Sequence, residues 1–495
     1  MVEVVTSSVE DPATWGALGV ASAIRAGDVS CREVVEALLD RIARYNPSLN
    51  AIVTLDEVGA RARADLADVA LARGEVWGPL HGVPVTFKDV FETAGLRTTS
   101  SHRPLAGYVP ERDATVVARL RAAGAIVLGK TNMPDLAGDN QSDSPVFGRA
   151  NNPWDLGRTP GGSSGGEAAA VAAGLTLLGS GSDIGGSLRL PAHFCGVFAL
   201  KPTDHLVSNA GHIPPLPGSV NTVRHLAVNG PIARHPEDLG LWVSLVAGPD
   251  GRDGTVPPVP VAGPELVPRT LAGLRIAWTD DVGGIPVTAD TRDALTRFAT
   301  ELADAGCQVV RAAPPGVDIE EVWQTYATLY GAMIFAMQPR VARVSLRTVG
   351  PAMFRDPIFG PSSRAATASA REFLHALARR DTLMWAMEEF LADVDAWVCP
   401  VASIPAFPHR PARQTGRPVQ VDDQKVPGTV ATIGHTMLAS LTGHPAVAQP
   451  LTHHNGDLPI GVQVIGRLWQ DHELLNVVST LTTLSGPCPR PPGSP

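Results

Sequence analysis

The chain has 495 residues, of which 44% are hydrophobic and 18% are charged, and its formal net charge is −9. This composition excludes a disordered protein, and the length allows two or three average domains or one large α/β domain. The acidic balance and the lack of any cluster of Lys and Arg in the sequence argue against a nucleic-acid partner.

No segment of the sequence has the features of a targeting or membrane-spanning element. The N-terminus lacks a basic start followed by an apolar core, and no apolar run reaches the ~18 residues that cross a bilayer. The five cysteines are scattered and include no C-x-x-C pair, which favours free thiols in a reducing compartment. We therefore expect a cytoplasmic protein without membrane contact, disulfide framework or cysteine zinc site.

Residues 1–75 are predicted to be mainly helical. Ser30 and Glu33 form a capping box ahead of a run of apolar residues that share one helical face. These residues are Val34, Val35, Leu38, Leu39 and Ile42. The pattern is typical of a helix that packs its apolar side against a core.

Strand and helix patterns alternate in the following sequence. Apolar strand patterns at 83–87 and 126–128 flank a helix that is predicted between Asp113 and Gly124. The same rhythm recurs further on, at 274–278, 290–305 and 308–310. The alternation predicts an α/β fold whose central mixed, mostly parallel sheet is covered by helices on both sides.

Lysine is rare in this chain, since only four of the 40 basic residues are lysines. Surface charge is therefore supplied by arginine, so a retained lysine is a candidate for work that arginine cannot do, such as releasing a proton. Lys88 ends the apolar strand pattern at 83–87, which would carry it toward the interior. This position makes Lys88 the first candidate for catalysis.

The stretch TPGGSSGGEAAA, residues 159–170, joins a glycine-serine cluster to an alanine-rich helix pattern. A flexible linker would continue in low-complexity sequence, and a phosphate loop would place a lysine after the glycines, so neither interpretation is favoured. A nucleophile elbow centred on Ser164 would have to follow a buried strand, whereas a loop pattern precedes this stretch. An esterase that uses Ser164 stays open as a rival.

A second glycine-serine cluster follows at 179–192. Its glycines would let the backbone N–H groups of Ile184, Gly185 and Gly186 point into one concavity, which suits an anion or a developing oxyanion. Ser187 would lie at the edge of that concavity. A serine needs a base to become nucleophilic, and a neutral lysine that acts through a second serine can provide it.

The sequence resembles the amidase signature hydrolases. The matching motifs are GVPVTFKD at 82–89, GKTNMP at 129–134, NPW at 152–154, PGGSSGG at 160–166, GSDIGGSLRLPA at 181–192, GV at 196–197, LKPT at 200–203, GPIAR at 230–234 and LPIGVQVIG at 458–466. The dense part of the resemblance covers residues 80–204 approximately, and in combination these motifs are highly specific.

The resemblance implies a Ser-Ser-Lys triad. It makes Ser187 the nucleophile that carries the acyl group, Lys88 the base, and Ser163 the bridging serine that follows a cis peptide bond. The N–H groups of residues 184–187 would hold the oxyanion. Ala137, Gly138 and Asp139 occupy a stretch that borders the acyl site in the family. No metal or organic cofactor is implied.

The resemblance also implies a single domain over residues 1–495. Pro/Gly-rich stretches at 247–268 and 400–428 mark long connections around a middle region. We expect N-terminal helices at 1–75, the signature core at 76–245, a variable pocket or lid region at 246–430, a return to the core at 431–485 and a disordered tail at 486–495.

The expected activity is hydrolysis of small apolar or aryl amides, with aryl esters and carbamates (urethanes) as close alternatives because the same acyl transfer serves them. Rival hypotheses are the catalytic subunit of a glutamyl-tRNA amidotransferase, which works in a complex, and a catalytically silent anion-binding protein. Aromatic and methionine residues between 323 and 337 suit either an apolar channel or a helix core. The expected partner is the small-molecule substrate, and a homodimer is compatible with these expectations.

Overall fold

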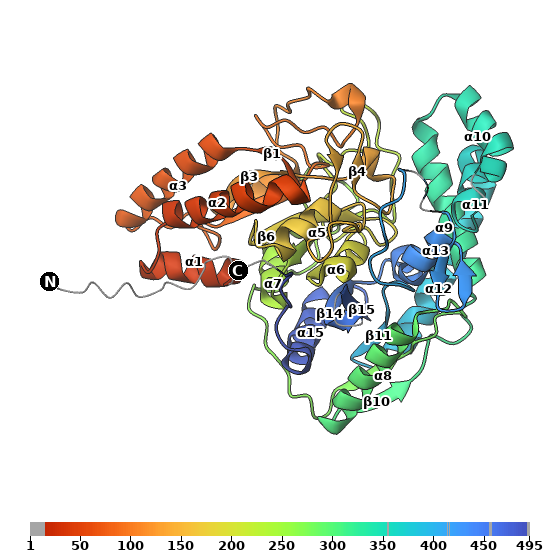
Figure 1. Ribbon diagram of the computed structural model, residues 1–495. Helices are drawn as coiled ribbons and strands as arrows, with labels where there is room; N and C mark the ends of the chain where they lie inside the picture. The colour runs from red at the N-terminus through yellow and green to blue at the C-terminus, as the bar shows by residue number, and fades with distance from the viewer. Residues whose placement is uncertain (1–14, 354–355, 413, 415, 455–457, 493–495) are drawn as a thin grey trace.

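An 11-stranded mixed sheet occupies the centre of the protein (Figure 1), in a computed structural model that describes residues 15–353, 356–412, 414, 416–454 and 458–492. Its strands are β1 (Ile52–Leu55), β2 (Pro84–Lys88), β3 (Ile126–Thr131), β6 (Leu178–Asp183), β7 (Phe198–Lys201), β8 (Val228–Ala233), β9 (Arg275–Trp278), β10 (Gln308–Arg311), β11 (Ala396–Pro400), β14 (Ala446–His454) and β15 (Leu458–Ile465). They lie in the order β1-β3-β2-β6-β8-β7-β14-β15-β11-β9-β10. Two small hairpins pair β4 (Asp143–Ser144) with β5 (Gly148–Arg149), and β12 (Val419–Val421) with β13 (Gln424–Val426).

The predicted α/β class with a mixed sheet is confirmed, but less of the sheet is parallel than we predicted. Parallel pairing is confined to β3-β2-β6 and to β11-β9-β10. The other neighbouring strands pair antiparallel. One reason is that residues 202–227 lead from β7 to its neighbour β8 without a crossover helix. Strands β14 and β15, which are consecutive in the chain, likewise pair with each other antiparallel.

Helices cover both faces of the sheet. On β6, Gly179 faces Glu167 of α5 (Gly165–Ala172), whereas the next residue, Ser180, accepts a hydrogen bond of 2.9 Å from Trp242 of α7 (Pro236–Val246). Successive strand residues point to opposite faces, so α5 and α7 lie on opposite sides. Further helices are α4 (Thr115–Ala122), α6 (Arg189–Cys195), α8 (Ala289–Asp304), α14 (Met437–Thr442) and α15 (Asp471–Ser485).

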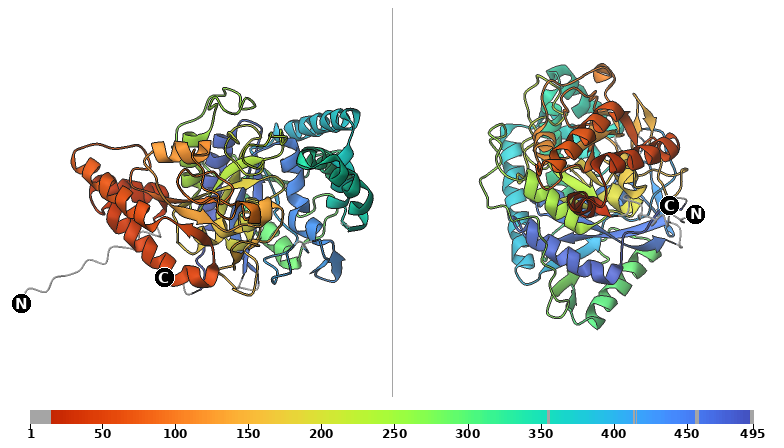
Figure 2. Two further views of the ribbon diagram at one scale, coloured as in Figure 1. Left: turned by 90° about the horizontal axis from the view of Figure 1, so that it is seen from above. Right: turned by 90° about the vertical axis from the view of Figure 1, so that its left-hand side faces the viewer.

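The two ends of the molecule are built from helices (Figures 1 and 2). One end holds α1 (Gly16–Ala26), α2 (Cys31–Leu49) and α3 (Glu57–Ala72), and the other holds α9 (Ile319–Ile334), α10 (Arg340–Met353), α11 (Phe359–Arg364), α12 (Ala370–Leu391) and α13 (Gly428–Ile433). The predicted capping box starts α2, because Ser30 accepts from the N–H of Glu33 while the Glu33 side chain accepts from that of Ser30. All five apolar residues predicted for its inner face are buried.

Residues 246–430 contribute to the central sheet as well as to the helical end. The predicted strand-helix-strand unit is confirmed as β9, α8 and β10, and β11 lies beside β9. Helices α9, α12, α13 and α14 share a second hydrophobic cluster with Trp397 of β11. This region is therefore part of the main fold, rather than a lid laid over it.

The predicted disordered tail is wrong for residues 486–492. Cys488 is buried, its thiol donates to the carbonyl of Gly196, and its own carbonyl accepts from Arg234 at 3.1 Å. The burial of Cys488 and these two hydrogen bonds therefore hold this segment on the core. Residues 1–14 and 493–495, for which we predicted helix and disorder, lie outside the described residues.

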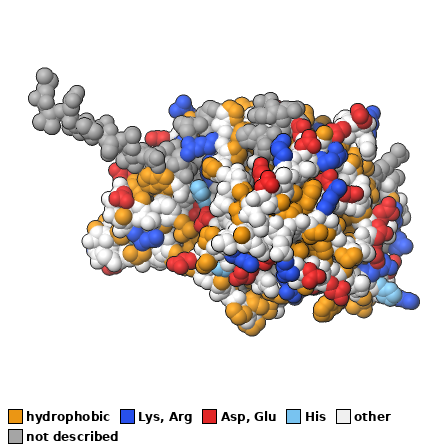
Figure 3. Space-filling view, turned by 90° about the horizontal axis from the view of Figure 1, so that it is seen from below, with side chains coloured by type: hydrophobic (Ala, Val, Ile, Leu, Met, Phe, Trp, Pro, Cys, Tyr) orange, Lys and Arg blue, Asp and Glu red, His pale blue; other side chains and the backbone are white. Residues whose placement is uncertain are grey.

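The cysteines lie in the interior, and charged side chains of both signs lie on the surface (Figure 3). All five cysteines are free and buried. On the face drawn in Figure 3, acidic and basic side chains are interspersed among apolar ones. Among the described helices, none combines the length and the apolar character needed to cross a membrane.

Candidate active site

Lys88 is the last residue of β2 and is completely buried. Its Nζ lies 2.7 Å from Ser163 Oγ, 3.0 Å from Ser182 Oγ and 3.5 Å from the carbonyl oxygen of Ser182. Burial lowers the pKa of Lys88 from its ordinary value to about 7, against the opposing effect of the negative charges of Asp183 and Glu167. A large share of Lys88 is therefore neutral near pH 7, and its nitrogen can accept a proton.

Ser163 lies in the glycine-serine loop that leads into α5. The peptide bond between Gly162 and Ser163 is cis, as the resemblance implied. Gly162 packs so closely on the backbone of Asp139 and Gln141 that a Cβ there would lie 2.5 Å from the Asp139 carbonyl oxygen and 2.6 Å from the Gln141 nitrogen. Only glycine fits at this position without a shift of the backbone.

Ser164 holds this loop on the end of β6. Its Oγ lies 3.2 Å from the Ser182 carbonyl oxygen, and its N–H donates to the Ser187 carbonyl at 3.1 Å. The side chain is fully buried, and the segment before it is a loop rather than a strand. This environment lacks the strand that a nucleophile elbow at Ser164 would need.

Ser187 is the last residue of the turn at 184–187, which Asp183 and Arg189 support. The Asp183 carboxylate accepts from the N–H groups of Gly186 and Leu188 at 2.7 and 3.1 Å, and it pairs with Arg189 at 3.1 Å. Burial raises the pKa of the Asp183 carboxyl, but Arg189 and the backbone donors lower it further, so the net pKa lies below its usual value. The pair thus stays ionised inside the protein.

The N–H groups of the turn have different partners. Gly186, whose φ is +122°, gives its N–H to Asp183, so it is not free for a ligand and the expectation that Gly186 belongs to the oxyanion site needs correction. Within the described residues, no acceptor meets the N–H groups of Ile184, Gly185 and Ser187. These three groups can receive an anionic oxygen.

Two residues outside the signature motifs hold the same turn from the opposite side. Tyr326 of α9 donates its hydroxyl to the Ile184 carbonyl at 3.2 Å, and Thr436 donates to the Gly185 carbonyl at 2.7 Å. With both carbonyls bound in this way, the peptide N–H groups are oriented as well. Sequence patterns did not reveal either residue, because the contacts join segments that are far apart along the chain.

A cavity of about 610 Å³, counting its open mouth, adjoins Ser163 and Ser187. It is lined by Leu136, Ala137, Ser163, Ser182, Asp183, Ile184, Ser187, Asn209, His212, Pro214, Pro215, Asn221, Val223, Ala227, Tyr330 and Ile334. Of the three residues that we expected to border the acyl site, Ala137 lines this cavity, together with Leu136, whereas Gly138 and Asp139 lie on a neighbouring depression.

The sequence profile of the Amidase family matches residues 33–475 of this chain, a range that includes Lys88, Ser163 and Ser187. The chain belongs to the amidase family. It is accordingly a hydrolase that acts on carbon–nitrogen bonds of amides.

Individual relatives agree with this assignment. A glutamyl-tRNA(Gln) amidotransferase subunit of Halorhodospira halophila is 33% identical over 92% of this chain and 94% of its own length. The indoleacetamide hydrolase of Bradyrhizobium diazoefficiens is 34% identical over 95% of this chain and 87% of its own length. Among solved structures, 6-aminohexanoate cyclic dimer hydrolase complexed with substrate is similar, with a TM-score of 0.80, 26% identity and coverage of 97% of this chain and 98% of that chain.

Glu167 of this amidase is a fully buried carboxylate that two threonine hydroxyls bind. Thr131 donates to one carboxylate oxygen at 2.6 Å, and Thr86, which shares a strand face with Lys88, donates to the other. Burial raises the pKa of Glu167 to about 7, against the lowering effect of these hydrogen bonds and of Lys130 and Lys88. Glu167 is therefore an interior acceptor for hydroxyl groups of β2, the strand that ends in Lys88, and of β3.

The aromatic residues of α9 have both of the roles that the sequence allowed, since some pack in the helix core and others line the apolar cavity. Trp323 and Tyr326 are buried in the second hydrophobic cluster, and Tyr330, whose ring stacks on Tyr326, reaches the cavity together with Ile334. One helix therefore contributes to the core with one side and to the cavity wall with its C-terminal turn.

Proposed function

We propose that this amidase hydrolyses the C–N bond of linear amides with small apolar or aryl groups, through an acyl-enzyme on Ser187. The observation that supports the proposal most directly is the contact of 2.7 Å between the buried Lys88 Nζ and Ser163 Oγ, next to a cavity that Ser163 and Ser187 both line. Aryl esters and carbamates are expected as weaker substrates, because the same acyl transfer cleaves them.

In the proposed mechanism, neutral Lys88 accepts the proton of Ser163 while Ser163 accepts the proton of Ser187. Ser187 Oγ then attacks the substrate carbonyl, and the N–H groups of Ile184, Gly185 and Ser187 donate to the oxygen that becomes negative. Ser163 returns a proton to the leaving nitrogen, and the amine departs. Water then attacks the acyl-enzyme by the same relay in reverse and releases the acid.

The chemistry of the cavity wall supports an apolar substrate. Its side chains are mostly aliphatic, proline or aromatic, and its uncharged polar groups include Asn209, His212 and Asn221. The lining Asp183 is already paired with Arg189. An aromatic amide is also consistent with the 34% identity to a relative named indoleacetamide hydrolase.

Two alternative activities compete with this proposal. The amidotransferase subunit of Halorhodospira halophila is 33% identical, but free glutamine carries an ammonium and a carboxylate, and no Lys or Arg occurs among the described residues that line the cavity. A carbamate hydrolase would use the same groups as an amidase, so only a comparison of substrates separates the two.

A hydrolysis screen of matched aryl amides, aryl esters, carbamates and glutamine tests the proposal. We expect kcat/KM to be highest for a neutral aryl or apolar amide and at least about 100-fold lower for glutamine, since an unpaired buried charge costs about 2.7 kcal/mol or more. Ser187→Ala should abolish all of these activities, whereas Ser164→Ala should retain turnover. Higher kcat/KM for carbamates than for the matched amides would make this a carbamate hydrolase, and failure of a fluorophosphonate to label any serine would support a silent protein.

The pH dependence of kcat/KM should follow Lys88. The pKa of this lysine is lowered by burial to about 7, so the reactive neutral form is present above that pH and is lost as the pH falls through it. We expect kcat/KM for a neutral amide to rise about tenfold per pH unit below pH 6 and to level off above pH 8. A profile that falls between neutral and mildly alkaline pH, with circular dichroism unchanged, would contradict this role of Lys88.

A further inference from the structure

The long loop at 202–227 builds much of the cavity wall. It connects β7 to β8, which are antiparallel neighbours in the sheet, so the two ends of the loop lie side by side at the same edge of the sheet. Seven of the sixteen residues that line the cavity belong to it: Asn209, His212, Pro214, Pro215, Asn221, Val223 and Ala227. Whatever holds the two ends of this loop together therefore also positions the wall.

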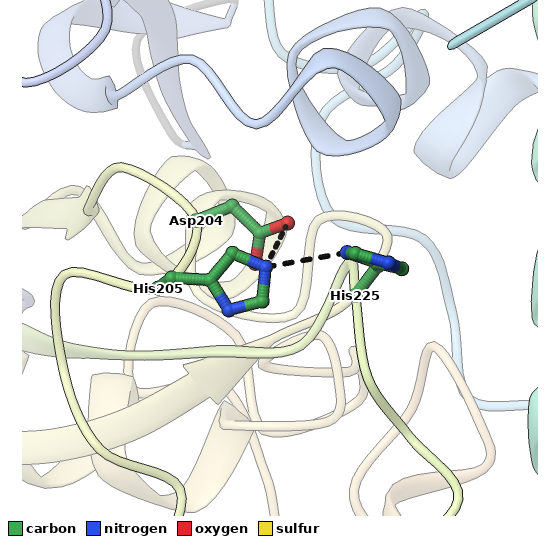
Figure 4. Close-up of side chains that lie close together, drawn as sticks. All are labelled: Asp204, His205 and His225. Carbon is green, nitrogen blue, oxygen red and sulfur yellow. Dashed lines mark hydrogen bonds and ion pairs between the residues drawn. The ribbon is translucent and has the colours of Figure 1, made fainter. Parts of the chain in front are cut away.

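Three side chains meet at the neck of this loop. Asp204 and His205 lie just after β7, and His225 lies just before β8 (Figure 4). The Nε2 atom of His205 is 3.2 Å from Nδ1 of His225 and 3.5 Å from Oδ2 of Asp204. In Figure 4 both dashed contacts meet at this nitrogen of His205, one from the Asp204 carboxylate and one from the His225 ring. Within the described residues, this is the one group of three His, Cys, Asp or Glu residues whose ligand atoms lie within 4.8 Å of one another.

These separations fit a small divalent metal ion. A tetrahedral ion with bonds of about 2.0–2.1 Å holds its ligand atoms roughly 3.3–3.4 Å apart, which is close to the 3.2 and 3.5 Å seen here. Two imidazole nitrogens and one carboxylate oxygen are ligands that Zn²⁺ accepts, with water in the fourth position. The ligand types and these two separations thus agree, and the ligand atoms of the third pair, Asp204 and His225, lie within 4.8 Å of each other.

The backbone holds the two imidazoles in this orientation. His205 has a φ of +68°, and Leu226, next to His225, has a φ of +75°, although neither residue is glycine. Such conformations cost about 1 kcal/mol or more and persist where the surroundings require them. Both occur at the neck of the loop, at His205 and directly after His225.

Arg380 of α12 holds the carboxylate without blocking it. Its Nη2 donates to Asp204 Oδ2 at 2.8 Å, while its Nε is fixed by the Leu441 carbonyl at 2.7 Å. Asp204 Oδ2 also accepts from the N–H of Leu226 at the longer distance of 3.5 Å, so a cation at Oδ2 would displace this long contact while Arg380 stays in place. Outer residues that orient a ligand in this way are common at metal sites.

We propose that Asp204, His205 and His225 bind a divalent transition-metal ion of the Zn²⁺ type, which joins the two ends of the 202–227 loop. The role is structural, because none of the three residues lines the cavity. Bound metal would restrict the loop and with it the wall that carries His212 and Val223. No sequence pattern indicated such a site, since the ligands come from two segments without a spacing motif.

Zinc binding to the untagged, full-length protein tests the proposal. After treatment with a chelator, equilibrium dialysis at pH 7.5 followed by elemental analysis should give one Zn²⁺ per chain. Co²⁺ in place of Zn²⁺ should give the absorption bands of a tetrahedral site. His225→Ala and His205→Ala should each weaken Zn²⁺ binding by at least about 10-fold, the lower bound for loss of a group at a metal site. The matched control is His375→Ala, which removes an exposed histidine from α12 and should bind like the wild type.

A thermal unfolding series provides a second measurement that does not depend on activity. Saturating Zn²⁺ should raise the Tm of the wild type and of His375→Ala, and it should leave the Tm of a folded His225→Ala variant unchanged. If His225→Ala does not fold, His225→Gln serves instead. The proposal is overturned if the wild type binds no Zn²⁺ at concentrations up to 100 μM, or if the His205 and His225 variants retain wild-type binding and the Tm shift, which would place the metal elsewhere.

Discussion

Replacing Lys88 with arginine is expected to reduce kcat/KM for a neutral amide by at least about 10⁴-fold, and Lys88→Ala should lose as much. The loss corresponds to about 5.5 kcal/mol of transition-state stabilisation. Arginine keeps the positive charge and the approximate length of the side chain, but it cannot give up its proton at working pH. Lys88 Nζ, in contrast, is buried against two serine hydroxyls with a pKa lowered by that burial to about 7.

Two comparisons separate the relay from a packing effect. Lys425, in contrast to the buried Lys88, is exposed, so Lys425→Arg and Lys425→Ala should leave kcat/KM and Tm unchanged. In folded Lys88→Ala, a small primary amine such as methylamine should restore part of the activity, and the rescue should increase with the neutral fraction of the amine. Turnover of Lys88→Arg within about tenfold of the wild type would rule out Lys88 as the base.

Much of the chemistry at this site was accessible from sequence because it lies in short segments. Lys88 could be singled out from the scarcity of lysine and from the apolar strand before it, and the structure places it against Ser163 as the motifs implied. The capping box at Ser30 and the β9-α8-β10 unit were likewise visible as local patterns. The capping box and the strand-helix-strand unit depend on residues that lie close together in the chain. Lys88 and Ser163 lie further apart, but both belong to a dense set of motifs.

The sequence was less informative where a role depends on contacts between distant segments. The N–H of Gly186 was expected to face an oxyanion, but it donates to the Asp183 carboxylate instead. This contact depends on the geometry of the turn, which the presence of glycine alone does not determine. Tyr326 and Thr436 support the same turn although each is more than 140 residues away from it in the chain. No motif spacing in the sequence could therefore predict these contacts. Cys488 packs under Gly196 in the same way, which is why the last segment was expected to be disordered.

The same physical reason explains the strand directions. Alternating strands and helices suggested mostly parallel pairing, whereas the order of strands follows from which connections cross the sheet. The loop at 202–227 returns to a neighbouring strand, and this return creates both the antiparallel pair β7-β8 and the wall of the cavity. A connection without recognisable secondary structure therefore determines both the local topology and the shape of the substrate site.

Asp183→Asn is expected to lower the free energy of unfolding by about 3–5 kcal/mol and kcat/KM by at least about 100-fold. The stability loss follows because Arg189, which is fully buried, would keep its charge without a counter-charge. The activity loss follows because the Asp183 carboxylate also fixes the N–H groups of Gly186 and Leu188, on either side of Ser187. Denaturant unfolding followed by circular dichroism measures the first effect, and amide hydrolysis measures the second.

Asp65→Asn provides the matched control for this prediction. Asp65 also pairs with an arginine, Arg32, at 2.8 Å, but 57% of the Asp65 side chain is exposed, so its loss should cost at most about 1 kcal/mol and leave kcat/KM unchanged. In the double variant Asp183→Asn/Arg189→Met, removal of the unpaired charge should recover part of the stability but not the activity, because the turn still lacks its carboxylate. Equal stability losses for Asp183→Asn and Asp65→Asn would contradict the role assigned to the buried pair, since the two positions differ chiefly in their access to water.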